Sequence, residues 1–144
     1  MRGYFGIGII NTKTVFNIGT LWRSAQNFGA AFIFTIGRRY KQEPSDTLKT
    51  TRHIPLFHYL DFEDFQAHRP VSCPLVGIEQ ADNSIDLNNF SHPEKAIYLL
   101  GAEDNGLPKE IIGKCQGIVH ISSPMCLNVA VAGSIVMYDR SSKK

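Results

Sequence analysis

Short apolar runs and amphipathic stretches alternate along the chain. The runs are rich in β-branched and aromatic residues and end at glycine, asparagine or charged positions, which is typical of buried strands. They predict strands at residues 4–10, 30–36, 55–59, 74–79, 95–100 and 117–121. Apolar residues at helical spacing, and residues that favour helix ends, predict helices at residues 17–29, 61–68, 108–114 and 128–140. Strands that alternate with helices predict an α/β fold with a mainly parallel sheet flanked by helices.

The first and last predicted helices differ in character. Asn17 is a suitable N-cap for the first one, and Gly29 is a suitable C-terminal stop. The last one carries almost no charge before Asp139, so it is too apolar for a surface helix and we expect it to pack on several sides.

In open α/β sheets ligands bind beyond the carboxyl ends of the strands, so we expect the functional residues in the loops that follow strands.

Composition places the chain among ordinary globular domains. Its 144 residues suit one domain, and no internal repeat or low-complexity linker divides residues 1–144. Hydrophobic residues make up 43% and charged residues 19%, which excludes a disordered segment. Fifteen Lys and Arg residues against thirteen Asp and Glu residues give a net charge of +2, so charge alone indicates no partner.

Basic residues nevertheless gather in one polar stretch, at Arg38, Arg39, Lys41, Lys49 and Arg52. If the chain binds RNA, we expect Arg38, Arg39, Lys41 and Arg52 to make salt-dependent contacts with phosphates. The alternative is a solvated loop face without a partner.

Cysteine usage indicates a reducing setting. Cys73, Cys115 and Cys126 are widely spaced and include no CxxC pair, so we expect neither a metal site nor a disulfide framework. This usage fits a cytoplasmic protein. The first ten residues are too short for a membrane span and lack a signal-peptide cleavage site, so we expect no membrane association.

Three loops that follow predicted strands carry the candidate chemistry. The first holds Asn17, Gly19 and Arg23, and the planar guanidinium of Arg23 suits bidentate contact with a phosphate. Taken alone, this segment is equally compatible with a capped helix that bears a surface arginine. The second loop, GAEDNGL, has Gly101 and Gly106 around Glu103.

The spacing of the second loop is not that of a phosphate-binding loop, and its two acidic residues would repel an anion. A ligand with hydrogen-bond donors and a positive centre suits it better, although a plain structural turn is an alternative. The third loop, ISSPMCLN, ends with Asn128 as a candidate helix cap. Cys126 beside Leu127 is more typical of a packed thiol than of a nucleophile.

Taken together and in this order, the three segments resemble the signature of the SpoU (TrmH-type) family of the SPOUT superfamily of RNA methyltransferases. The matching patterns are NxGxxxR at residues 17–23, GxExxGL at 101–107 and [SC]LNV at 126–129. The resemblance implies a parallel-sheet domain with a deep C-terminal trefoil knot, which no periodicity predicts. It also implies S-adenosylmethionine as cofactor, tRNA or rRNA as substrate, and a homodimer packed through the first and last helices.

The resemblance assigns roles to single residues. It implies that Gly101, Ile121 and Leu127 contact the cofactor largely through the backbone, and that Ile78 lines the adenine pocket. Cys126 takes the place of a serine that many members carry, which puts any hydroxyl role there in doubt, and the loop before it is shorter than usual. The catalytic set implied by the resemblance comprises Arg23 with the supporting residues Asn17, Glu103 and Asn128.

Residue chemistry restricts what Arg23 does. Methyl transfer to a ribose hydroxyl requires an in-line approach and stabilisation of negative charge on the oxygen, both of which a nearby cation assists. A guanidinium does not normally lose its proton, so orientation and charge stabilisation suit Arg23 better than general-base catalysis. Two alternatives are a non-catalytic RNA-binding paralogue of the same fold and a nucleotide-binding α/β domain that merely looks similar.

Overall fold

The computed structural model describes residues 3–37 and 53–143 of the chain. The strands are β1 (Tyr4–Ile10), β2 (Phe32–Ile36), β3 (Leu56–Tyr59), β4 (Leu75–Ile78), β5 (Ile85–Asp86), β6 (Lys95–Leu100) and β7 (Gly117–His120). The helices are α1 (Val15–Asn27), α2 (Phe62–His68), the 3-10 helix η2 (Leu87–Asn89), α3 (Lys109–Ile112) and α4 (Val129–Ser142).

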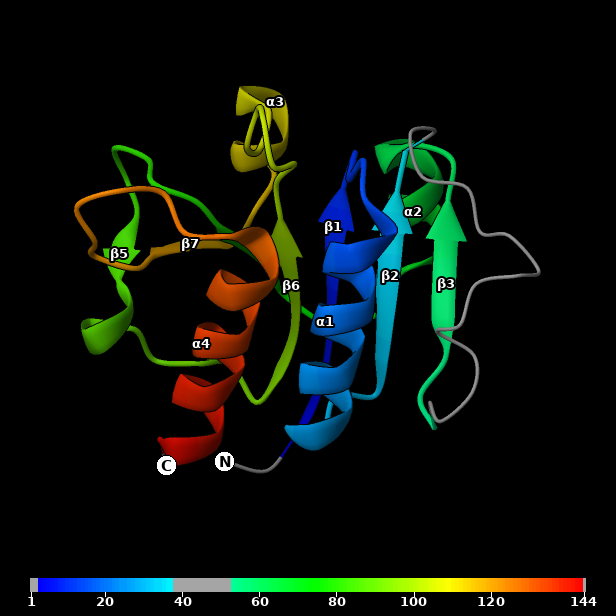
Figure 1. The fold of residues 1–144 in the computed structure, drawn as a ribbon, viewed down its shortest axis with the longest axis horizontal. Helices are drawn as coiled ribbons and strands as arrows, with labels where there is room; N and C mark the ends of the chain where they lie inside the picture. The colour runs from blue at the N-terminus through cyan, green and yellow to red at the C-terminus, as the bar shows by residue number, and fades with distance from the viewer. Residues whose placement is uncertain (1–2, 38–52, 144) are drawn as a thin grey trace.

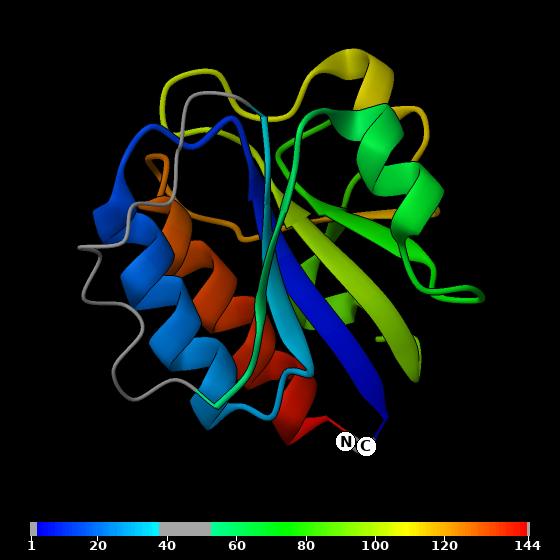
Figure 2. The ribbon, with the colours of Figure 1, turned by 90° about the vertical axis from the view of Figure 1, so that its right-hand side faces the viewer.

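The strands form one sheet in the order β3-β2-β1-β6-β4-β7-β5, and all pairs are parallel. Helices α1 and α4 lie side by side on one face, and α2 lies on the other (Figures 1 and 2). The predicted fold class, a parallel sheet flanked by helices, is therefore confirmed. No helix within residues 3–37 and 53–143 is long and apolar enough to cross a membrane.

Each face of the sheet has its own hydrophobic core. Ile7 and Ile9 of β1 contribute to the core beneath α1 and α4, whereas Phe34 of β2 and Leu99 of β6 contribute to the core beneath α2 and α3. A sheet buried on both faces requires apolar side chains at successive positions, which explains the continuous apolar runs in the sequence.

Helix α4 packs closely against both α1 and the sheet. A Cβ atom on Gly133 would lie 2.6 Å from Leu21 Cδ1 and 2.9 Å from Leu100 Cδ1, so a larger residue would push these side chains away. Ser134 of α4 lies opposite Ser24 of α1, with 2.7 Å between their hydroxyl oxygens. The nearly charge-free last helix thus packs against α1 and the sheet, whereas Val131, Ile135 and Tyr138 are exposed.

Two sequence-based expectations differ from the structure. Helix α1 begins at Val15 rather than Asn17, because Thr14 is the N-cap and its hydroxyl accepts a hydrogen bond from the Asn17 amide. The short elements β5 and η2 were not predicted, since a two-residue strand among polar positions gives no periodic signal.

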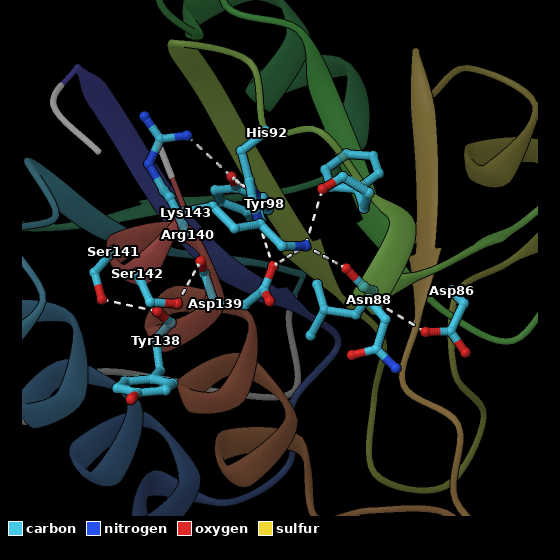
Figure 3. A network of polar contacts seen from close by, with 12 residues as sticks. Asp86, Asn88, His92, Tyr98, Tyr138, Asp139, Arg140, Ser141, Ser142 and Lys143 are labelled. Atoms are coloured by element: carbon cyan, nitrogen blue, oxygen red, sulfur yellow. Dashed lines mark hydrogen bonds and ion pairs between the residues drawn. The ribbon is translucent and has the colours of Figure 1, made fainter.

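The C-terminal end of α4 is anchored by a polar network that includes a buried histidine (Figure 3). His92 lies between the Tyr98 hydroxyl, 2.7 Å from Nδ1, and Asp139 Oδ2, 2.7 Å from Nε2. A carboxylate only accepts, so the Nε2 atom that faces Asp139 carries the ring proton. Burial lowers the pKa of His92, so the ring is neutral at neutral pH and its Nδ1 atom accepts from the Tyr98 hydroxyl.

The cationic side chains of the same network bind the chain segment before β6. Arg140 is buried and donates from Nη1 to Pro93 O and from Nη2 to Glu94 O, both at 2.6 Å. Lys143 donates to Phe90 O at 3.0 Å and pairs with Asp139 at 2.7 Å. The end of α4 and residues 87–94 are thereby fixed to each other.

This network predicts an acid-sensitive stability. Burial lowers the pKa of His92 below its ordinary value of 6.5, and the hydrogen bond to Asp139 only partly opposes this shift. The folded state thus binds fewer protons than the unfolded state, and stability is full above pH 6.5 and is lost as the pH falls through the folded-state pKa. Urea unfolding between pH 8 and pH 5 should show this loss.

Replacing His92 by leucine should remove this pH dependence and lower the free energy of unfolding at pH 8 by about 1–3 kcal/mol, because Tyr98 and Asp139 lose a partner. The control is His68→Leu, at a histidine with a largely exposed side chain on α2. If the free energy of unfolding of the His92 variant depended on pH as it does in the wild type, His92 would not be the source of the acid sensitivity.

Candidate active site at the carboxyl ends of the strands

Three segments far apart in the sequence meet above the carboxyl ends of β1 and β6. Asn17 lies in the first turn of α1, Glu103 in the turn after β6, and Asn128 immediately before α4. The Asn17 Nδ2 group donates to Glu103 Oε1 at 3.2 Å, and Asn17 Oδ1 accepts from Asn128 Nδ2 at 3.1 Å. The structure therefore brings together three of the four residues predicted to form the catalytic set.

Asn128 also caps α4, as predicted. Its Oδ1 atom accepts hydrogen bonds from the backbone amides of Ala130, at 2.9 Å, and Val131, at 3.1 Å. One side chain thus satisfies two N–H groups that the first turn of a helix leaves without partners. The start of α4 is fixed relative to α1 by the same amide.

Glu103 accepts hydrogen bonds from three donors. Besides Asn17, these are the Thr12 hydroxyl at 2.5 Å and the Lys13 backbone amide at 3.1 Å. Burial raises the pKa of Glu103, but the three hydrogen bonds outweigh this effect and hold the pKa below its usual value. Glu103 is therefore ionised at neutral pH and is a poor proton acceptor.

The turn after β6 depends on both of its glycines. A Cβ atom on Gly101 would lie 2.1 Å from the Gly106 carbonyl carbon, and Gly106 itself has a φ of +66°. The Gly106 amide donates to Ala102 O at 3.1 Å, and the Leu107 amide donates to Glu79 Oε2 at 2.7 Å. Two amides that the sequence suggested for a ligand are thus satisfied within the protein.

Glu79 was missed as a site residue, because it looked like the last residue of a buried strand. It follows β4 directly, and its carboxylate also accepts from the Gln80 amide at 3.0 Å. An acidic residue directly after a fully buried strand was the available signal, since a half-buried carboxylate needs nearby donors.

The residues predicted to bind the cofactor lie at the ends of three neighbouring strands, β6, β4 and β7. Ile78 ends β4 and is buried, Gly101 follows β6 and is buried, and Ile121 follows β7 and is half-buried. Cys126 and Leu127 are exposed in the loop between β7 and α4. Within the described ranges, no group of three or more His, Cys, Asp or Glu residues is placed to hold a metal ion.

Arg23 stands apart from the hydrogen-bonded residues. It lies on α1 with an exposed side chain and forms no ion pair with any residue that the structure describes. Its guanidinium is therefore available to an external anion. The predicted phosphate contacts Arg38, Arg39, Lys41 and Arg52 lie outside the described residues.

A cavity of about 450 Å³ lies at the carboxyl ends of β1, β2 and β3. It is lined by Ile10, Asn11, Ile36, Gly37, Leu60, Asp61 and Phe62, and none of the residues predicted for the cofactor is among them. The two halves of the carboxyl edge therefore differ, with the cavity over β1–β3 and the residues suggested for the cofactor over β4, β6 and β7.

Comparison with known proteins identifies similar sequences and folds. A model of the SpoU rRNA Methylase family matches residues 5–138 of the chain. A mouse tRNA (guanosine(18)-2'-O)-methyltransferase is 29% identical over 137 residues, which are 85% of this chain but only 8% of the mouse protein.

Two solved structures share the fold. An AdoMet-bound rRNA methyltransferase from Sinorhizobium meliloti matches with a TM-score of 0.85 and 23% identity, over 100% of this chain and 59% of that one. A structure concerned with 2-OH methylation of C/U34 on tRNA matches with a TM-score of 0.83 and 20% identity, over 95% of this chain and 93% of that one.

The hydrogen bonds of Glu103 predict a large difference between two adjacent acidic residues. Glu103→Ala should lower the free energy of unfolding by about 2–4 kcal/mol, because the buried Thr12 and Asn17 lose their acceptor and each unpaired group costs about 1–3 kcal/mol. Asp104→Ala should cost less than about 1 kcal/mol, because Asp104 pairs with Lys13 at 3.8 Å between exposed side chains. Urea unfolding measures both, and equal losses would contradict the anchoring role of Glu103.

Proposed function

Because this chain belongs to the SpoU rRNA Methylase family, we propose that it transfers a methyl group from S-adenosylmethionine to a ribose 2'-hydroxyl of tRNA or rRNA. The observation that carries the proposal is the hydrogen-bonded series Glu103–Asn17–Asn128, which joins all three motif segments at one edge of the sheet. The mouse relative is named as a tRNA methyltransferase and the Sinorhizobium protein as an rRNA methyltransferase, so they support RNA as the substrate class.

The residues at the ends of β4, β6 and β7 fit S-adenosylmethionine. Ile78, Ile121 and Leu127 offer an apolar surface for an adenine ring, and the irregular loop 121–127 offers backbone polar groups beside it. The ionised Glu103 gives the neighbouring turn a negative charge that favours a cationic sulfonium. When bound, the cofactor supplies the activated methyl group, and the protein supplies orientation.

Arg23 acts on the RNA in this proposal. Its exposed guanidinium binds a phosphate bidentately and stabilises the negative charge that develops on the ribose oxygen. Glu103 is poorly suited to removing the proton, because its lowered pKa makes it a weak base and its carboxylate already accepts three hydrogen bonds. The hydrogen bonds among Asn17, Glu103 and Asn128 fix the position of α1 relative to α4. They thereby fix the position of Arg23 relative to the cofactor loop.

We further propose that two copies of the chain pack through α1 and α4, and that the C-terminal part of the chain forms the trefoil knot of the family. Exposed apolar residues recur on α4 at Val131, Ile135 and Tyr138, a spacing that places them on one side of the helix. Phe16, at the start of α1, is 79% exposed. A stripe of this kind supports an interface between helices, across which Arg23 of one copy would act on RNA beside the cofactor of the other.

Further RNA contacts are proposed for the basic cluster Arg38, Arg39, Lys41 and Arg52. A net charge of only +2 leaves phosphate binding to such local groups. Cys73, Cys115 and Cys126 are free thiols, which supports the cytoplasmic setting that we propose for the protein.

Substitution of Arg23 tests the catalytic proposal. Arg23→Ala should lower methyl transfer by about 100-fold or more, the usual effect of removing one transition-state donor, and Arg23→Lys should not restore it because the planar fork is lost. Transfer is measured with tritiated S-adenosylmethionine on RNA, and cofactor affinity by calorimetric titration with S-adenosylhomocysteine. Affinity should stay at the wild-type value.

The matched control is Asn27→Ala, at an exposed position one turn after Arg23 and at the C-terminal end of α1. Full activity in Arg23→Ala would refute the catalytic role proposed for Arg23. A wild-type protein that binds RNA but no S-adenosylhomocysteine would instead support the non-catalytic paralogue.

Charge placed on the α4 stripe tests the dimer. Ile135→Asp should convert a dimer to a monomer in sedimentation experiments, because an unpaired carboxylate would be buried at the interface. Val71→Asp is the control, since Val71 is 89% exposed but lies in the loop between α2 and β4. A wild-type protein that sediments as a monomer would refute the proposed interface.

A further inference from the structure

Four polar side chains connect the two loops that follow β4 and β7. The Ser84 hydroxyl oxygen lies 2.8 Å from His120 Nδ1, and the Ser122 hydroxyl donates to Asp86 Oδ2. The parallel pairing of β5 with β7 places Asp86 directly beside His120, whose Nε2 lies 3.8 Å from Asp86 Oδ2. These contacts belong to none of the three motifs.

Asp86 is the centre of this cluster, because its two carboxylate oxygens serve different segments. Oδ1 accepts from the Asn88 amide at 2.8 Å and caps η2, whereas Oδ2 accepts from Ser122. Both hydrogen bonds, that of Ser122 first, lower the pKa of Asp86, so the carboxylate is ionised at neutral pH. An ionised acceptor gives stronger hydrogen bonds than a neutral one.

The loop that Ser122 belongs to has little other support. Residues 122–127 are exposed and form neither helix nor strand. Within this stretch the Ser123 hydroxyl donates to Met125 O at 2.7 Å, a contact internal to the loop. The Ser122–Asp86 hydrogen bond therefore ties the start of the loop to the edge of the sheet, one residue after Ile121.

We propose that Asp86 is a positioning residue, which through Ser122 holds residues 121–127 in the conformation that binds S-adenosylmethionine. The inference rests on the proposed function, in which this loop contacts the cofactor. A loop that is ordered before binding loses less conformational entropy when the ligand arrives, so the clamp strengthens binding without touching the ligand. The contact between Ser84 and His120 ties the loop after β4 to the end of β7. Because β4 ends at Ile78, this contact also fixes the loop after Ile78 relative to residues 121–127.

Calorimetric titration with S-adenosylhomocysteine tests this role. Asp86→Asn and Ser122→Ala should each weaken binding by about tenfold to a hundredfold, the effect of losing a hydrogen bond to a charged group. The double variant should be no weaker than either single one, because both remove the same interaction. Ser122→Thr retains the hydroxyl and should bind as the wild type does.

Two further measurements separate positioning from a merely structural role. At saturating S-adenosylmethionine the rate of methyl transfer should be unchanged, so that the loss appears in KM and not in kcat. Without ligand, amide hydrogen exchange in residues 121–127 should become faster in both variants, while exchange in α1 stays the same.

The control is Ser142→Ala, which removes an exposed hydroxyl at the C-terminal end of α4 and should leave affinity unchanged. If the wild-type protein binds S-adenosylhomocysteine and Asp86→Asn and Ser122→Ala bind it equally well, the positioning role is refuted while the proposed function stands. If the wild-type protein does not bind it, both are refuted.

Discussion

The Asn17 carboxamide lies between two other motif residues and uses both of its polar atoms. It donates to Glu103 at 3.2 Å and accepts from Asn128 at 3.1 Å. The direction of each bond is fixed, because an ionised carboxylate only accepts and the Asn128 oxygen is occupied by the α4 amides. An aspartate at position 17 could not take this place, since its oxygen would face the oxygen of Glu103. One amide thus joins the start of α1, the start of α4 and the turn after β6.

Helix α4 is held at both ends and along its middle by different kinds of interaction. Asn128 caps its start, Gly133 allows close packing on Leu21 and Leu100, and Arg140 binds the segment before β6 at its end. Charged residues are confined to the last turns, where they join the buried network around His92. The remaining surface of the helix is free to be apolar, which is what an interface between two copies requires.

The local pattern of apolar and polar residues was enough to predict the helices and strands, but not the contacts between them. Strands buried on both faces give long apolar runs, so most strands could be predicted within about two residues. Asn17 was wrongly expected to cap α1, because Thr14 competes for that position and both residue types are good caps. The hydrogen bonds of Glu103 with Thr12 and Asn17 join residues about ninety positions apart, and no local signal carries that distance. Asp86 was missed for the same reason, because its partner Ser122 lies 36 positions away.

The site contains side chains that are engaged by several protein partners and side chains that are not, and this difference suggests which of them fix geometry. Glu103 accepts three hydrogen bonds and Asn128 makes three, so both are largely engaged within the protein. Arg23 is exposed and forms no ion pair within the described part of the chain. A group that meets substrate must be free before substrate arrives, whereas a group that fixes geometry must already be bound. By this criterion Asp86 belongs with Glu103, and the exposed side chain of Arg23 fits the role in RNA contact that we propose for it.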